Sequence, residues 1–105
     1  MKQFIKVKLN NHKWDIRFVP KELMPVNDAW GFTYFARKTV DIRNDLDKEN
    51  TELTICHEIV HALLMSHGRG FQTKFTQEDV CEFVSWNIKE VMEVTAKIMK
   101  ERYSD

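Results

Sequence analysis

Two histidines and a glutamate within residues 57–61, in the sequence HEIVH, have the types and spacing needed to hold a metal ion and activate water. On an α-helix, side chains four positions apart lie on one face, so His57 and His61 can share one cation. Glu58 projects beside this pair, where its carboxylate can take a proton from metal-activated water. This HExxH spacing is typical of zinc hydrolases. The sequence therefore predicts one Zn²⁺ per chain, with Glu58 as the catalytic residue.

The residues around the motif predict the helix that must position it. Apolar residues recur there at helical spacing and would give the helix one buried side: Ile55, Ile59, Val60, Leu63 and Leu64. We expect this helix to begin near Thr51, as its N-cap, and to end at about Ser66, before Gly68. If the two histidines were incidental surface residues, the same helix would form without a metal site.

Four short segments before this helix alternate in the manner of strands, and one long segment after it is helical. We expect two β-hairpins, built from residues 4–9 with 14–19 and 31–36 with 39–43. Thr76 and the acidic residues after it predict the start of a second helix that continues to about Tyr103. Its apolar stripe is expected to face the core: Val80, Val84, Ile88, Val91, Thr95 and Ile98. The predicted fold class is α+β, a small, mostly antiparallel sheet packed on two helices.

Length and charge bound the possible functions. The 105 residues suffice for one domain, 1–105, and sixteen basic residues balance sixteen acidic ones, so we expect no nucleic-acid partner. No apolar run approaches the ~20 residues of a membrane span, and the first residues resemble a strand rather than a signal peptide. Cys56 and Cys81 lack the framework of a secreted protein, so we expect reduced thiols and a cytoplasmic location.

A catalytic zinc usually has three protein ligands, and three residues compete for the third position. His67 follows His61 at the metzincin spacing, but Leu64 stands where that pattern has the glycine that turns the chain back to the metal. On a continuous helix His67 would lie ~9 Å beyond His61 along the axis, too far for a shared ion. Glu78 and Glu82 lie one turn apart at the start of the second helix, and spacing alone does not separate them.

The segments HEIVHALL and EDVCEFVS resemble zinc-peptidase-like proteins of the ImmA/IrrE type, especially short phage-encoded members, over about residues 31–92. In that family a second helix carries a pattern close to E-x-x-A-N-x-F-A, whose first Glu is the third metal ligand. Glu78 matches that Glu, whereas this chain departs from the pattern at Cys81, Glu82, Val84 and Ser85. The resemblance thus favours Glu78, with Glu82 and then His67 as alternatives. It also implies a zincin-like fold, with an edge strand from residues 31–43 beside the metal.

These expectations together describe a zinc-dependent peptidase, a metalloprotease in which Glu58 passes the proton of metal-activated water to the leaving amine. The oxyanion stabiliser could be His12, Tyr34 or His67, and the sequence does not select among them. The resemblance implies a phage or mobile-element context in a bacterial host, with a protein substrate such as a repressor or antitoxin-like regulator. The alternative function is a zinc-binding regulatory module with weak or no turnover that acts by protein–protein binding. The oligomeric state is left open.

Overall fold

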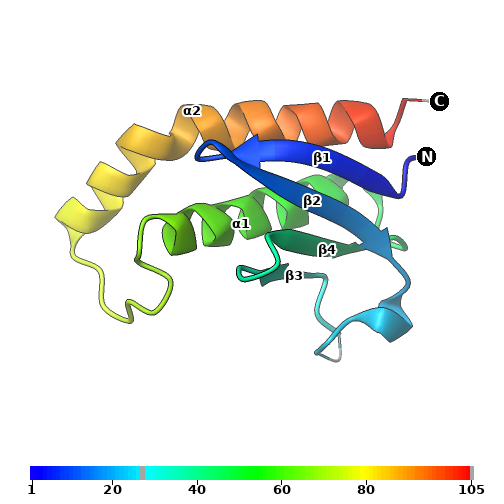
Figure 1. The fold of residues 1–105 in the computed structure, drawn as a ribbon, viewed down its shortest axis with the longest axis horizontal. Helices are drawn as coiled ribbons and strands as arrows, with labels where there is room; N and C mark the ends of the chain where they lie inside the picture. The colour runs from blue at the N-terminus through cyan, green and yellow to red at the C-terminus, as the bar shows by residue number, and fades with distance from the viewer. Residues whose placement is uncertain (27, 105) are drawn as a thin grey trace.

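A computed structural model describes residues 1–26 and 28–104 of the chain. Four strands form one sheet, and two helices, α1 (Lys48–Ser66) and α2 (Gln77–Arg102), pack against it (Figure 1). The α+β fold class is therefore confirmed. Within the described ranges, neither α1 nor α2 combines the length and apolar character that a bilayer-spanning helix needs.

The sheet is mixed, because its two hairpins join through a parallel pairing. β1 (Phe4–Leu9) pairs antiparallel with β2 (His12–Val19), and β3 (Gly31–Tyr34) pairs antiparallel with β4 (Thr39–Arg43). β4 then runs parallel to β2, which gives the strand order β1-β2-β4-β3. β3 is thereby left as an edge strand of the sheet. Both expected hairpins are present, although β3 stops at Tyr34, two residues earlier than the sequence pattern indicates.

Alternation along the strands places one apolar face of the sheet against the helices. The buried residues of that face meet the buried side of α1 and the second half of α2 to form one core: Ile5, Val7, Leu9, Trp14, Ile16, Phe18, Val40, Ile42, Ile55, Ile59, Ala62, Leu63, Val91 and Ile98. On the opposite face, Arg17 forms two hydrogen bonds of 2.8 and 2.9 Å with the carboxylate of Asp41. This pairing raises the pKa of Arg17 above its usual value.

The N-cap of helix α1 lies four residues earlier than predicted. Asp47, rather than Thr51, is the N-cap, and its carboxylate accepts a 2.7 Å hydrogen bond from the Asn50 backbone N–H. Thr51 lies inside the first turn, where its hydroxyl donates to the Asp47 carbonyl at 2.8 Å. Both residue types cap helices well, so the sequence alone did not separate them. The helix continues through Leu64 and ends with His67 as its C-cap.

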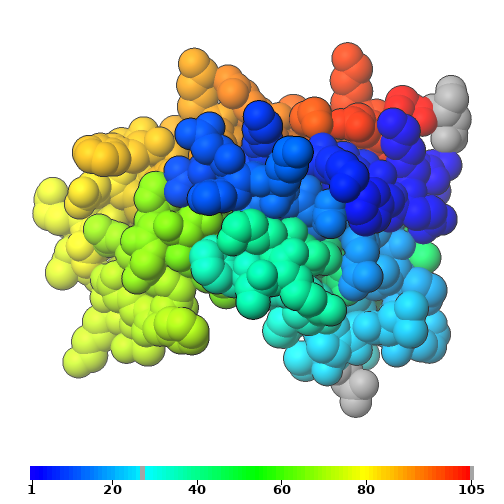
Figure 2. Space-filling model, viewed as in Figure 1, coloured from blue at the N-terminus to red at the C-terminus, as the bar shows by residue number. Residues whose placement is uncertain are grey.

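Helix α2 begins with the predicted cap but does not bury all of its apolar stripe. Thr76 and Asp79 form a capping box at its start. Val91, Thr95 and Ile98 are buried as expected, whereas Val80, Val84 and Ile88 remain 50%, 46% and 44% exposed. The expectation that the whole stripe faces the core was therefore wrong. In Figure 1 the first turns of α2 project beyond the end of α1, and Val80, Val84 and Ile88 line a hollow of about 350 Å³ together with residues of α1 instead of packing tightly on it. In Figure 2 these turns and the loop before them form the end of the molecule farthest from both termini.

Candidate metal centre

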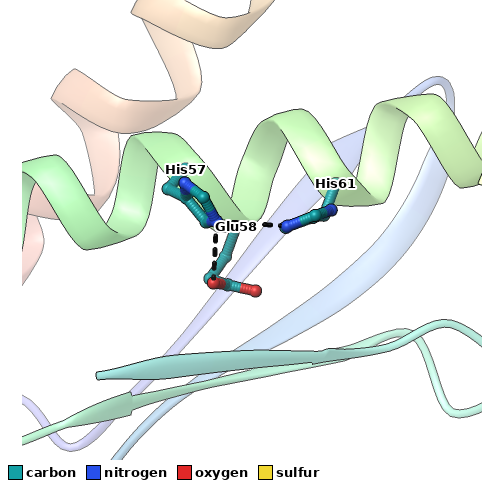
Figure 3. Close-up of side chains that lie close together, drawn as sticks. All are labelled: His57, Glu58 and His61. Carbon is teal, nitrogen blue, oxygen red and sulfur yellow. Dashed lines mark hydrogen bonds and ion pairs between the residues drawn. The ribbon is translucent and has the colours of Figure 1, made fainter. Parts of the chain in front are cut away.

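The two motif histidines point at one another from successive turns of α1. The Nε2 atoms of His57 and His61 lie 3.1 Å apart, and their rings meet edge to face with centroids 4.7 Å apart (Figure 3). Both side chains are exposed to solvent. Helical spacing alone would place them on one face, and the rotamers seen here also aim their ring nitrogens at a common point.

This separation fits a zinc ion. With Zn–N bonds of ~2.0–2.1 Å and a tetrahedral angle between them, two ligand nitrogens lie about 3.3 Å apart. The observed 3.1 Å between His57 Nε2 and His61 Nε2 is close to that value. His57, Glu58 and His61 form a group whose ligand atoms all lie within 4.8 Å of one another. Two imidazole donors suit zinc, and Glu58 places a carboxylate beside them.

Glu58 is held between α1 and the edge strand β3. Its side chain points from the helix towards the strands (Figure 3), and the residue is only 6% exposed. The Thr33 hydroxyl on β3 donates a 2.7 Å hydrogen bond to Oε1 of Glu58. The other carboxylate oxygen, Oε2, lies 4.0 Å from Nε2 of His57. One oxygen is thus engaged in positioning the side chain, while the other faces the histidines.

Gly31 makes room for this carboxylate. A Cβ atom at position 31 would lie 2.8 Å from Cγ of Glu58 and 2.8 Å from Cγ2 of Thr54, closer than such atoms approach. Gly31 and Thr33 occupy alternate positions of β3, so both face α1. Neither Gly31 nor Thr33 has a role that the sequence pattern predicts. A glycine at the start of a strand, two residues before a threonine, was the available signal for a close approach of another element.

The three candidates for the third ligand lie outside the group formed by His57, Glu58 and His61. Glu78 is exposed on the first turn of α2. Glu82 approaches Arg69 at 4.0 Å. Nε2 of His67 lies 3.2 Å from Oδ1 of Asn87 on α2, a contact that engages this ring nitrogen. The structure therefore brings together the two histidines and the catalytic glutamate of the sequence prediction, but not its third ligand.

None of the three residues considered for oxyanion stabilisation belongs to the group either. Tyr34 follows Thr33 on β3, so its ring lies on the opposite face of the sheet, where it packs on Phe32 with ring centroids 4.9 Å apart. His12 begins β2 and pairs with Leu9 on β1, away from the β3 edge.

Two hollows flank the candidate centre and share Gly31, His57 and Glu58. One, of about 370 Å³, is also lined by Ala29, Trp30, Leu53 and Thr54. The other, of about 280 Å³, is also lined by Phe32, Thr33, His61 and Met65. The candidate centre therefore lies in a continuous depression that runs between β3 and α1.

Comparisons with protein-family models, with curated proteins and with solved structures found no match to this chain. The assignment of a function consequently rests on the residues and geometry described above.

Proposed function

We propose that this protein is a zinc-dependent peptidase of the HExxH type, with a zincin-like arrangement of its sheet and active-site helix. The observation that carries the proposal is the pairing of His57 and His61, with Nε2 atoms 3.1 Å apart, beside the buried carboxylate of Glu58. A structural ion pair or a core histidine would not require two exposed imidazoles to converge next to a buried carboxylate.

In this proposal His57 and His61 hold the metal, which when bound supplies a Lewis acid that acidifies water and polarises a carbonyl. Glu58 accepts the proton of the attacking water as the C–O bond forms. It then delivers that proton to the leaving amine as the C–N bond breaks. The Thr33 hydroxyl engages Oε1, so Oε2, the oxygen nearer to His57, is the atom that carries the proton.

Glu78 is our proposed third ligand, with Glu82 as the alternative and His67 after it. Glu78 matches the third metal ligand of the ImmA/IrrE-type proteins that the sequence resembles. In the structure, however, Glu78 lies apart from His57 and His61. Its ligation therefore requires the first turns of α2 to approach α1. The partly exposed Val80 and Val84 on those turns would gain apolar contacts from such an approach.

The free edge of β3 favours an extended peptide as substrate. The Arg43 N–H donates to the Trp30 carbonyl at 2.9 Å, so Trp30 and Phe32 belong to the hydrogen-bonded pairs between β3 and β4. The backbone groups of Gly31 and Thr33 then point to the open edge, where a peptide strand could pair with them.

We propose a protein regulator as the natural substrate, such as a repressor or antitoxin-like partner in a phage or mobile-element context in the bacterial cytoplasm.

A second candidate function is a zinc-binding regulatory module without turnover, favoured by the exposed apolar stripe on α2. Val80, Val84, Ile88 and Met92 lie at four-residue intervals and are 44–64% exposed. Such a stripe is suited to binding another protein. In this alternative the histidines and zinc stabilise the fold, and Glu58 has no chemical role.

Zinc content and two matched variants distinguish these functions. Elemental mass spectrometry on protein never exposed to chelator should find about one zinc per chain, lost in His57→Ala. Glu78→Gln, Glu82→Gln and His67→Ala variants identify the third ligand by zinc loss. Glu58→Gln should retain zinc and abolish peptide hydrolysis if the protein is a peptidase. Cellular function that survives Glu58→Gln but not His57→Ala would instead support the regulatory module.

A further inference from the structure

The geometry points to a selectivity pocket for one bulky apolar side chain of the substrate, formed by Trp30 and Leu53 beside Glu58. This inference rests on the proposed peptidase function and specifies what the protein would cleave. Trp30 and Leu53 are 45% and 61% exposed, yet both line the hollow of about 370 Å³ that reaches His57 and Glu58. Exposed large apolar residues gathered beside candidate catalytic groups are typical of a binding site.

The pocket has walls from two elements that the fold brings together. Trp30 precedes β3, and Leu53 lies on α1 one turn before His57. Ala29 and Gly31 form the strand side of the pocket, and Thr54 lies on the helix side. Thr54 does not offer its hydroxyl proton to a ligand, because that hydroxyl donates to the Asn50 carbonyl at 2.7 Å.

The chemistry of these walls selects against charged side chains. Apart from His57 and Glu58, which serve the candidate centre, none of the described residues that line the pocket carries an ionisable group. A lysine or glutamate side chain in the pocket would lose water without gaining a partner. A leucine, methionine or phenylalanine side chain would instead bury apolar surface against Trp30 and Leu53.

The position of the pocket assigns the preferred residue to the neighbourhood of the scissile bond. A peptide strand pairing with Gly31 and Thr33 alternates its side chains between the two faces of the sheet. Those on the helix side enter the depression between β3 and α1. The pocket shares Gly31, His57 and Glu58 with the second hollow, so a side chain held by Trp30 and Leu53 lies directly beside the bond that Glu58 serves.

The first test is the cleavage specificity of zinc-loaded protein on a pool of peptides from a digested bacterial proteome, with cleavage sites read by mass spectrometry. One position adjacent to the cut should be enriched in Leu, Met, Ile or Phe. In a synthetic peptide that carries the preferred residue, changing this residue to Ala should lower kcat/KM roughly 10–200-fold.

The Leu53→Glu variant of the protein should change the preference at that peptide position towards Lys and Arg. Leu23→Glu is the matched control, because Leu23 is similarly exposed, at 67%, and lies outside both hollows.

Cleavage without an apolar preference, or a preference that Leu53→Glu leaves unchanged, would overturn the pocket while leaving the peptidase intact. A second measurement separates the two proposals if no cleavage occurs. In the Glu58→Gln variant, the peptide acetyl-Ala-Ala-Leu-Ala-amide should shift the NMR signals of the Trp30 indole and the Leu53 methyl groups. The same peptide with Glu in place of Leu should leave these signals unchanged. Binding without cleavage would support the pocket and contradict hydrolysis. If neither peptide perturbs these signals and no cleavage is found, the pocket is refuted.

Discussion

Thr33 on the edge strand β3 donates a 2.7 Å hydrogen bond to the buried carboxylate of Glu58 on helix α1. The two residues are 25 positions apart in sequence, and both are more than nine-tenths buried. The bond fixes one carboxylate oxygen and leaves the other directed towards His57. In the proposed peptidase, Thr33 is therefore a positioning residue that acts through Glu58.

Replacing Thr33 by Val should impair catalysis without removing the metal. Val has the same shape but no hydroxyl, so Oε1 of Glu58 would lose its partner in a buried setting. An interaction of this kind contributes about 1–3 kcal/mol, which corresponds to a fall in kcat/KM of roughly 5–150-fold. Zinc content should remain at the wild-type level. Thr33→Ser keeps the hydroxyl and should recover most of the activity. Equal losses in Val and Ser variants would contradict the positioning role.

Gly31→Ala should displace Glu58, because the new Cβ would lie 2.8 Å from Cγ of that residue. A misplacement of about 1 Å at a catalytic group can lower the rate about 100-fold. Overpacking should also lower the free energy of unfolding by about 1–3 kcal/mol. Peptide hydrolysis and urea denaturation measure the two effects.

Gly68→Ala provides the control for this prediction. Gly68 has φ of +75°, and no atom of the described residues lies within 4 Å of a Cβ added there. Alanine there should cost about 1–2 kcal/mol of stability through backbone strain and leave kcat/KM unchanged. If Gly31→Ala and Gly68→Ala affected activity equally, the loss would reflect general destabilisation rather than displacement of Glu58.

The parts of the molecule that the sequence predicted are those fixed by local signals. Asn10 and Asn11 both have positive φ and form the two-residue turn of the first hairpin, as their residue types favour. Thr76 caps α2 through a bond that spans three residues. His57, Glu58 and His61 lie on one helix, so helical periodicity alone placed them together.

The parts that the sequence did not predict depend on contacts between distant elements. β4 rather than β3 joins β2, because pairing between hairpins is decided by the whole core and not by either turn. The roles of Gly31 and Thr33 depend on how closely β3 approaches α1. The apolar period of α2 indicated which face is apolar, but not that a hollow of about 350 Å³ lies between α1 and the face that carries Val80 and Val84.

The start of α2 should loosen in acid. The hydrogen bond from the Thr76 backbone N–H to the Asp79 carboxylate, at 2.9 Å, lowers the pKa of Asp79 below its ordinary 3.8, and Arg69 at 3.6 Å adds to this effect. A carboxylate whose pKa is lowered by folding stabilises the folded state above its unfolded pKa, and this stabilisation is lost as pH falls through the folded value. The cap should therefore be intact above pH 4 and weaken below the folded pKa.

NMR titration of the Thr76 amide and the Asp79 carboxyl carbon would follow this transition. Both signals should change together at a pH below 3.8. Asp79→Asn should remove the transition from the Thr76 amide. Glu78→Gln is the matched control, because Glu78 occupies the same first turn without forming the capping bond, and the transition should persist in it. A Thr76 transition that remains in Asp79→Asn would assign the acid sensitivity to another group.

The two halves of α2 should respond differently to one and the same substitution. Val91 is 4% exposed and belongs to the core, whereas Val84 is 46% exposed in the first half of α2. Deleting the branched carbons at a buried site removes transfer free energy and leaves a cavity, so Val91→Ala should lower the free energy of unfolding by about 1.5–3 kcal/mol. Alanine is also the better helix former by roughly 0.5 kcal/mol, and this gain applies equally at both positions. The difference between the two variants therefore isolates burial.

Val84→Ala should change stability by less than about 0.5 kcal/mol, in either direction, because the lost contacts are few and the helix propensity improves. Urea denaturation of the zinc-free protein measures both variants without a contribution from the metal. Repeating the comparison with zinc tests the proposed approach of α2 to α1. If ligation by Glu78 draws the first turns of α2 onto α1, Val84 becomes buried, and Val84→Ala should then cost clearly more with zinc than without it. An unchanged cost would mean that these turns stay exposed and that the third ligand comes from elsewhere in the chain.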